Sequence, residues 1–199
     1  MSERRTSLLL VRHGQTPWNA AGRWQGHADP GLSELGRDQA AELAAALRHE
    51  LEGGWARIVS SDLRRARETA GILADSLGLA IETDARLREL DVGAWTGLTR
   101  SEIEARDLER LTAFESGEPT IRAGGGETRL EIRLRARALV GHVAERHAGQ
   151  RLIVVTHLGV IRALLPGVEP GNTDRYPVVA EEILARPIDH ERRAERGAL

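Results

Sequence analysis

The sequence contains no cysteine among its 199 residues, which excludes a disulfide framework, a thiolate metal site and a cysteine nucleophile. Lysine is also absent, so all 28 basic residues are arginine, and they are balanced by 30 acidic residues. The net charge is only -2, so no overall field would attract nucleic acid or an anionic membrane. Aromatic residues make up 3% of the chain, which requires a largely aliphatic core.

Long apolar runs are missing as well. The longest is the five-residue segment 43–47, whereas a membrane-spanning helix needs about 20 apolar residues. The N-terminal apolar stretch, 8–11, is shorter than the roughly 7 residues of a secretory signal core. We therefore expect a cytoplasmic protein that binds neither membrane nor nucleic acid, and the sequence gives no indication of its oligomeric state.

The composition is that of a globular protein, with 41% apolar and 29% charged residues. No repeat, low-complexity tract or Pro/Ser-rich linker divides the chain. We expect a single domain over residues 1–199, with a charged tail at 189–199 that frays.

Short aliphatic runs bounded by polar residues alternate with amphipathic stretches along the chain. This alternation predicts an α/β fold, in which a mostly parallel central sheet is covered by helices on both faces. Strands are expected at 8–11, 58–60, 152–156 and 176–180. Apolar residues near helical spacing predict helices at 33–48 and 62–77.

Two further helix starts are marked by capping boxes, in which a Thr and a Glu three residues later satisfy free amides. They are Thr99 with Glu102 and Thr128 with Glu131. The stretch 115–127 between these helices has the composition of a loop. We interpret the arginines of the second helix as solvated surface residues: Arg129, Arg133 and Arg137.

The first predicted strand is followed directly by Arg12, His13 and Gly14. The carboxyl ends of strands form the ligand crevice of open α/β sheets, so this edge offers a guanidinium and an imidazole together. The strand at 152–156 likewise ends in a histidine, His157. If the two strands are neighbours, about 4.8 Å apart, both imidazoles face one reacting group.

Other polar residues are expected near the same edge. Ser60 and Ser61 end a strand, and the helix that follows carries two arginines in its first turn, where free amides and fixed positive charge favour phosphate. We interpret Arg64 and Arg67 as surface residues of that helix. Glu89 ends a short apolar segment, from which its carboxyl group could reach the crevice.

Two histidines with nearby carboxylates could instead bind a metal. A divalent cation beside Arg12 and Arg65 would meet like charge, whereas a phosphoryl group would be held by both guanidinium groups. The spacings H-x-H and H-x-x-x-H are also absent. We therefore expect no metal site and no cofactor.

Four blocks occur in the order RHGQTPWN, SSDLRRARETA, LRELDVGAWTG and VVTHLGVIRALL. They resemble motifs of the histidine phosphatase superfamily, also called the phosphoglycerate mutase-like family. The resemblance runs from about residue 8 to about residue 165 and takes in GRWQGHADPGLSELGRDQA and GGGET. Leu158 departs from it, because a Gly commonly follows the second His, and this leaves the pocket width and the amide contact open.

The resemblance implies an α/β sheet flanked by helices and assigns expected roles. His13 would accept the phosphoryl group, Glu89 would donate a proton, and the phosphate ligands would be Arg12, Arg65 and His157. Asn19 and Gln25 match positions in or near the substrate pocket. Thr16 offers a further hydrogen bond to an anion.

We expect a phosphomonoesterase that acts on a small phosphorylated metabolite, because two of the blocks look like those of small bacterial phosphatases. A cofactor-dependent phosphoglycerate mutase is the first alternative, although the chain between Glu89 and His157 leaves little for the segments that cover such a site. A non-catalytic binder of phosphorylated ligands is the second. Specificity is expected from Gln25, the loop at 115–126 and three tryptophans, Trp18, Trp24 and Trp95, but the sequence does not identify the ester.

Overall fold

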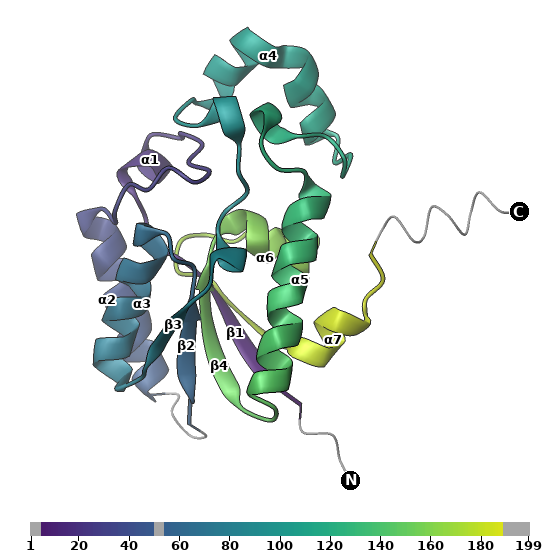
Figure 1. The fold of residues 1–199 in the computed structure, drawn as a ribbon. Helices are drawn as coiled ribbons and strands as arrows, with labels where there is room; N and C mark the ends of the chain where they lie inside the picture. Colours follow the sequence, from purple (N-terminus) through teal and green to yellow (C-terminus); the bar gives the residue numbers. More distant parts are fainter. Residues whose placement is uncertain (1–4, 50–53, 189–199) are drawn as a thin grey trace, which may run out of the picture.

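A computed structural model describes residues 5–49 and 54–188. Its five-stranded sheet has the order β3-β2-β4-β1-β5 (Figure 1). The strands are β1 (Ser7–Arg12), β2 (Arg57–Ser60), β3 (Ile81–Thr83), β4 (Arg151–Thr156) and β5 (Arg175–Val179). All neighbouring strands are parallel except β1 and β5, which are antiparallel. The predicted α/β fold with a mostly parallel sheet is confirmed.

The three aliphatic runs form the buried centre of the sheet. Side chains of β1 alternate between two apolar cores, because successive residues of a strand point to opposite faces. Leu8 and Leu10 enter one core, and Leu9 and Val11 enter the other. The edge strand β3 was not predicted, because its three side chains are exposed or half-buried and form no aliphatic run.

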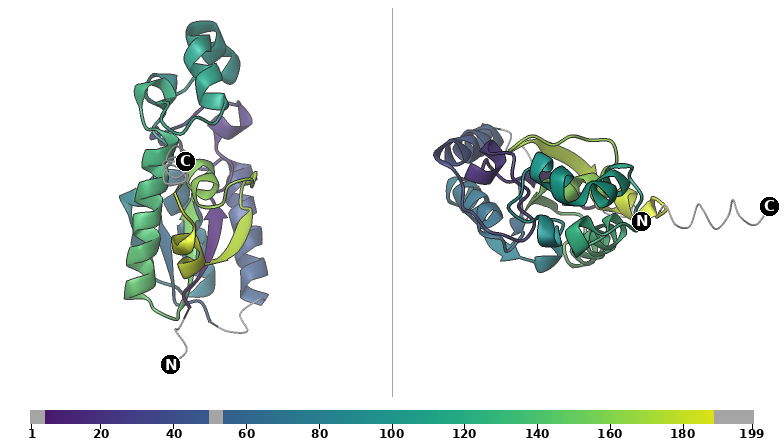
Figure 2. Two further views of the ribbon diagram at one scale, coloured as in Figure 1. Left: turned by 90° about the vertical axis from the view of Figure 1, so that its right-hand side faces the viewer. Right: turned by 90° about the horizontal axis from the view of Figure 1, so that it is seen from above.

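Helices cover both faces of the sheet, as expected (Figure 2). One face packs against α2 (Glu34–His49) and α3 (Arg64–Leu77), close to the predicted ranges. The other packs against α5 (Arg129–Arg146), α6 (Leu158–Leu164) and α7 (Ala180–Ala185). Both predicted capping boxes are present, at the starts of α4 (Arg100–Glu115) and α5.

The remaining segments lie beyond the carboxyl ends of the parallel strands (Figure 1). They are α1 (Pro17–Ala20), α4 and the short 3-10 turns η2 (Gly93–Trp95) and η3 (Ala123–Gly125); a third turn, η1 (Ala85–Leu87), follows β3. An aromatic cluster of Trp24, Trp95 and Phe114, with ring centroids 5.5–5.9 Å apart, packs the loop after α1 against η2 and α4. This group of segments forms a cap over one end of the sheet.

None of the helices within residues 5–49 and 54–188 is long and apolar enough to cross a membrane. The charged tail expected to fray, 189–199, lies outside the described residues.

Candidate active site

The polar ends of β1 and β4 lie side by side. The two strands are direct parallel neighbours, with Arg12 opposite Thr156, and the amide of His13 donates to the Thr156 carbonyl at 3.0 Å. The rings of His13 and His157 are both buried, with centroids 5.1 Å apart. The expectation that neighbouring strands bring two imidazoles together is therefore confirmed.

The hydrogen bonds of His13 determine which ring nitrogen carries the proton. Nδ1 lies 2.7 Å from the Gly14 carbonyl oxygen, which can only accept, so Nδ1 is the protonated nitrogen. Nε2 then holds a lone pair and accepts from Nε of Arg65 at 3.3 Å. Burial, reinforced by the charges of Arg65 and Arg12, lowers the pKa of His13 well below its ordinary value. The imidazole is neutral, with Nε2 available as a nucleophile.

The loop that carries His13 is held against α2 and α3. The Gly14 amide donates to Thr69 Oγ1 at 3.1 Å. A Cβ atom at Gly14 would lie 2.3 Å from the Gly36 carbonyl oxygen, so only glycine permits this close approach of loop and helix. The glycine thus serves the packing that positions His13.

His157 is also neutral. Burial first, and then the charge of Arg65, lower the pKa of His157 well below the ordinary value. Both ring nitrogens are buried and lack a hydrogen-bond partner among the described residues. A neutral imidazole still donates through one nitrogen, so His157 can offer a hydrogen bond to a ligand.

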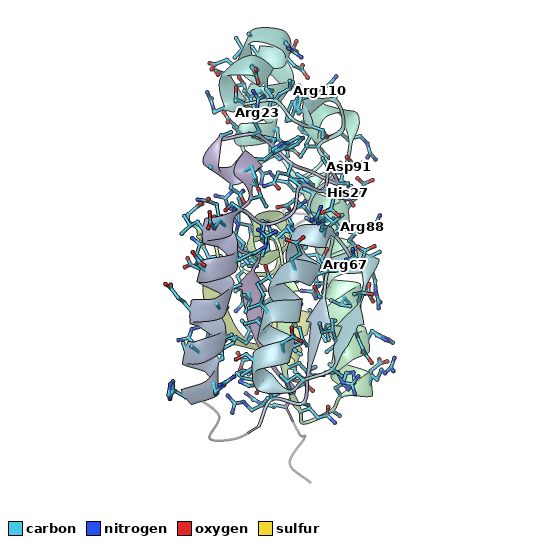
Figure 3. The ribbon with its side chains drawn as sticks, turned by 90° about the vertical axis from the view of Figure 1, so that its left-hand side faces the viewer. Arg23, His27, Arg67, Arg88, Asp91 and Arg110 are labelled. Atoms are coloured by element: carbon cyan, nitrogen blue, oxygen red, sulfur yellow. The ribbon has the colours of Figure 1, made fainter. Side chains whose placement is uncertain are left out.

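Arg65 is the one arginine of the α3 first turn that points inward. It is fully buried, and its Nη1 and Nη2 donate to the carbonyls of Ala28 at 2.7 Å and Gly26 at 2.9 Å. Arg64 and Arg67 are exposed, as expected, and Figure 3 shows Arg67 on the outer surface of α3.

The amides at the start of α3 are less available than the sequence suggested. The Arg64 amide donates to Oδ2 of Asp29 at 2.6 Å, so the chain's own carboxylate takes a position that was expected for phosphate. The positive charge of this turn reaches the cavity through the Arg65 side chain.

Arg12 is held in place by a loop beyond Pro166. The sequence pattern in this region was too weak to predict it. Its Nη1 donates to the Pro170 carbonyl at 2.7 Å, while its Nε is buried without a partner among the described residues. The Thr173 amide donates to the Arg12 carbonyl at 3.1 Å, and Asn172 Nδ2 donates to the His13 carbonyl at 3.1 Å. This loop therefore positions both residues.

Glu89 is half-buried, and its carboxylate meets the start of α6. Its Oε1 accepts from the amides of Leu90 at 2.8 Å and Gly159 at 3.0 Å. A Cβ atom on residue 159 would lie 2.2 Å from Oε1, so a larger residue there would displace the Glu89 carboxylate from this position. Leu158, at the position that departs from the family pattern, lines the cavity.

Arg135 of α5 was not singled out from the sequence, yet it holds the Glu89 segment. Its Nη2 donates to the Glu89 carbonyl at 2.9 Å and its Nη1 to the Arg88 carbonyl at 2.6 Å. Its Nε donates to Glu127 Oε1 at 2.8 Å. The sequence could not single out Arg135, because it is one of several arginines on a charged helix.

Asn19 and Gln25 line the cavity, whereas Thr16 does not. Thr16 is fully buried, where its side chain accepts from the Asn19 amide at 3.1 Å and donates to Gln25 Oε1 at 3.1 Å. The expected contact of Thr16 with substrate therefore does not fit the structure, because its hydroxyl caps α1 and orients the other two residues.

One cavity of about 280 Å³ brings the predicted residues together. It is lined by Arg12, His13, Asn19, Arg23, Trp24, Gln25, Gly26, Arg65, Glu89, Leu90, Val92, Phe114, Arg129, Ile132, Arg133, Leu158, Gly159, Arg162 and Ala163. His157 lies behind it, in ring contact with His13. Of the three tryptophans considered for specificity, Trp24 lines this cavity.

The interpretation of the α5 arginines as solvated surface is wrong. Arg129 and Arg133 line the cavity, and Arg137 donates to the Ile183 carbonyl at 2.6 Å near the end of α7. Residues off the apolar face of α5 therefore still meet other parts of the protein, namely the cavity and the end of α7.

Within the part of the chain that the structure describes, no group of three His, Asp or Glu side chains is arranged to hold a metal ion. The positive charge in the cavity is supplied by fixed guanidinium groups. Such groups suit an oxyanion, because they form charge-assisted, planar hydrogen bonds with it.

The sequence profile of the histidine phosphatase superfamily (branch 1) matches residues 8–182. A glucosyl-3-phosphoglycerate phosphatase of Mycobacterium tuberculosis is 40% identical over 167 residues, which cover 79% of this chain and 72% of that protein. Phosphoglycerate mutase-like protein 4 of Arabidopsis thaliana is 39% identical over 165 residues, covering 82% and 71%. The structure of mycobacterial glucosyl-3-phosphoglycerate phosphatase in complex with VO3 is 37% identical and has a TM-score of 0.76, covering 86% of this chain and 91% of that one. The chain belongs to branch 1 of the histidine phosphatase superfamily.

Proposed function

We propose that this protein is a phosphomonoesterase that hydrolyses a small phosphorylated metabolite through a phosphohistidine at His13. The state of His13 carries the proposal: its proton is held on Nδ1 by the Gly14 carbonyl, and Nε2 keeps its lone pair beside Arg65. A neutral imidazole with a lowered pKa needs no base to become a nucleophile. Phosphatases among the relatives support the same activity.

In the first step, Nε2 of His13 forms a bond to phosphorus as the bond from phosphorus to the ester oxygen breaks. Arg12 and Arg65, with a hydrogen bond from His157, hold the three equatorial oxygens, where charge accumulates in the transition state. Glu89, in its acid form, gives its proton to the departing alkoxide. The alcohol leaves, and the phosphoryl group stays on His13.

In the second step, water attacks the phosphohistidine and Glu89 takes a proton from it. The bond between nitrogen and phosphorus breaks, and inorganic phosphate and neutral His13 result. Glu89 is half-buried and faces the cavity, which is consistent with access by water. Its hydrogen bonds from the Leu90 and Gly159 amides hold it in place through both steps.

Removal of metal ions tests the proposal against a metal-assisted hydrolase. Turnover of 4-nitrophenyl phosphate is expected to be unchanged after dialysis against EDTA, because arginine side chains supply the positive charge. Phosphate release is measured with and without added zinc or manganese. Loss of activity in EDTA and its restoration by either metal would contradict the phosphohistidine mechanism.

The fate of the phosphoenzyme separates the two alternatives. A mutase returns the phosphoryl group to an acceptor such as a phosphoglycerate, so its phosphoenzyme is long-lived until that acceptor is added. A binding protein forms no phosphoenzyme at all. A hydrolase releases phosphate in water alone, which is the result that we expect.

The roles of neighbouring arginines give a second prediction. Phosphate and vanadate should inhibit competitively, and Arg65→Ala should weaken that inhibition by about 1 to 3 kcal/mol, the scale of a lost hydrogen bond to a charged group. Arg64→Ala is the matched control and should change the inhibition constant little, because Arg64 is exposed and pairs with Glu68. Thermal melting of both variants checks the fold. Equal effects at the two positions would remove Arg65 from the phosphate site.

A further inference from the structure

One short segment joins two parts of the candidate active site. Its residues are Gly26, His27 and Ala28, and we call it the linking segment. The carbonyls of Gly26 and Ala28 accept from the Arg65 guanidinium at 2.9 Å and 2.7 Å. The side chain of His27, between these carbonyls, reaches the Glu89 carbonyl oxygen, with Nε2 at 2.8 Å. The linking segment therefore connects the proposed phosphate ligand Arg65 to the backbone of the proposed proton donor.

His27 is the donor of this hydrogen bond. A carbonyl oxygen only accepts, so Nε2 of His27 carries a proton. In Figure 3 this side chain lies next to Arg88 and Asp91, on either side of the Glu89 segment. His27 is half-buried and does not line the catalytic cavity. It therefore contacts the backbone of Glu89 and not the place where substrate would bind.

The hydrogen bond at the Glu89 carbonyl also affects the Glu89 side chain. A peptide unit is planar, and its carbonyl and amide point in opposite directions. The Glu89 carbonyl and the Leu90 amide belong to one such unit, and that amide donates to Glu89 Oε1 at 2.8 Å. A donor that fixes the carbonyl therefore fixes the direction of the amide that holds the carboxylate.

Two donors share the Glu89 carbonyl. Arg135 Nη2 donates to it at 2.9 Å, in addition to His27. Arg135 comes from α5 and pairs with Glu127, whereas His27 comes from the segment that is bound to Arg65. Arg135 thus fixes the peptide unit relative to α5, and His27 fixes it relative to the phosphate ligand. Without His27 the carbonyl would still be bonded to Arg135, so loss of His27 changes the position of Glu89 more than the fold.

Gly26 brings the linking segment close to the chain that follows Glu89. Its φ is +50°, which favours glycine. A Cβ atom there would lie 2.8 Å from Cγ2 of Val92 and 3.1 Å from its backbone nitrogen. A larger residue would push the two segments apart. This close contact allows His27 to reach the Glu89 carbonyl.

We propose that His27 is a positioning residue for the Glu89 carboxylate and acts through the peptide unit of Glu89 and Leu90. The inference rests on the proposed phosphatase activity, in which Glu89 gives a proton to the leaving group. Arg65 Nε lies 3.3 Å from His13 Nε2, so the link through His27 sets the place of the proton donor relative to the scissile phosphate. A proton donor must lie within hydrogen-bond reach of the leaving oxygen, so a displaced carboxylate is a slower acid.

Two amide variants that differ in reach test the proposal. The side-chain nitrogen of Gln is as many bonds from Cα as Nε2 of His, whereas that of Asn is one bond closer. His27→Asn should therefore lose the hydrogen bond to the Glu89 carbonyl, and His27→Gln should keep it.

The readout is kcat/KM for two esters, glycerol 3-phosphate, whose alkoxide needs a proton, and 4-nitrophenyl phosphate, whose phenolate does not. The ratio of the alkyl to the aryl value should fall about five- to tenfold in His27→Asn, the scale of one hydrogen bond. In His27→Gln it should stay within about twofold of the wild-type ratio. A general loss of structure would lower both values and leave their ratio unchanged.

Two controls accompany these variants. His142→Asn should leave the ratio unchanged, because His142 is exposed on α5 and lies outside the catalytic cavity. In the Glu89→Gln background, His27→Asn should cause no further fall in the alkyl rate, because two changes that act through one group are not additive. Thermal melting of each variant checks that the fold is kept.

Three results would overturn the role of His27. They are an unchanged ratio in His27→Asn, an equal fall in His27→Gln, and a further fall in the alkyl rate when His27→Asn is added to Glu89→Gln. The proposed phosphatase fails in a different way, when the wild-type protein releases no phosphate from 4-nitrophenyl phosphate, so the two failures are distinguishable.

Discussion

Replacing His13 by Ala is expected to abolish phosphoryl transfer from every ester, alkyl or aryl, with a fall in rate of about 10⁴-fold or more. The reason is that the variant lacks the nitrogen that bonds to phosphorus. The proposed phosphate ligands Arg12 and Arg65 remain, so vanadate should still bind. Loss of turnover with binding retained would distinguish a missing nucleophile from a collapsed cavity.

The measurement is a single-turnover reaction with 4-nitrophenyl phosphate, in which released phenolate and protein-bound phosphate are followed together. His157→Asn provides the matched control, because it removes the neighbouring imidazole and leaves His13 in place. That variant should still form a phosphoenzyme, at a lower rate, since it has lost one hydrogen bond to the transferring group. If a phosphoenzyme forms on His13→Ala and not on His157→Asn, then His157, and not His13, accepts the phosphoryl group.

The sequence was most informative where a buried strand ends in polar residues. An aliphatic run fixes the strand, and the strand fixes where the next side chain lies, so the positions of His13 and His157 could both be predicted. Their proximity required one further fact, that β1 and β4 are direct neighbours. Helix starts could be predicted equally well, because the capping boxes at Thr99 and Thr128 are local and need no tertiary contact.

Residues whose role depends on distant contacts could not be found in this way. Arg135 holds the Glu89 segment 46 positions away in sequence, and Asn172 reaches the His13 carbonyl across 159. The same holds for Arg129 and Arg133, which helical spacing assigned to solvent. Packing of α5 beside α6 and under the cap brings them into the cavity. Periodicity predicts which side of a helix is polar, but not what that side faces.

Thr16 is a residue that the sequence placed at the substrate and the structure does not. A hydroxyl close in sequence to a reactive histidine looked available to substrate, yet the chain turns at this point and the hydroxyl caps α1. Local hydrogen bonding by Thr at the start of a helix competes with ligand binding. The residues that it orients, Asn19 and Gln25, are the ones that reach the cavity.

Glu89→Gln should slow the hydrolysis of an alkyl phosphate by roughly 10² to 10⁴, the usual contribution of general acid catalysis. An alkoxide cannot leave unprotonated, and an amide supplies no proton. The substitution keeps an oxygen that can accept from the Leu90 and Gly159 amides, so the local structure should persist. Glu104→Gln on α4 is the control, because that carboxylate is exposed and pairs with Arg100 on the helix surface.

An aryl phosphate separates proton donation from other roles of Glu89, because phenolate is a stable leaving group that departs without a proton. Phosphorylation of His13 by 4-nitrophenyl phosphate should therefore survive in Glu89→Gln. Hydrolysis of the phosphoenzyme should slow, since the group that takes a proton from water is gone, and the reaction should begin with a burst of phenolate. Rates are compared for the alkyl and aryl esters under single-turnover conditions. If the variant loses phosphoryl transfer from both esters to the same degree, Glu89 acts on the position of the substrate or of His13, and the proton donor is another group.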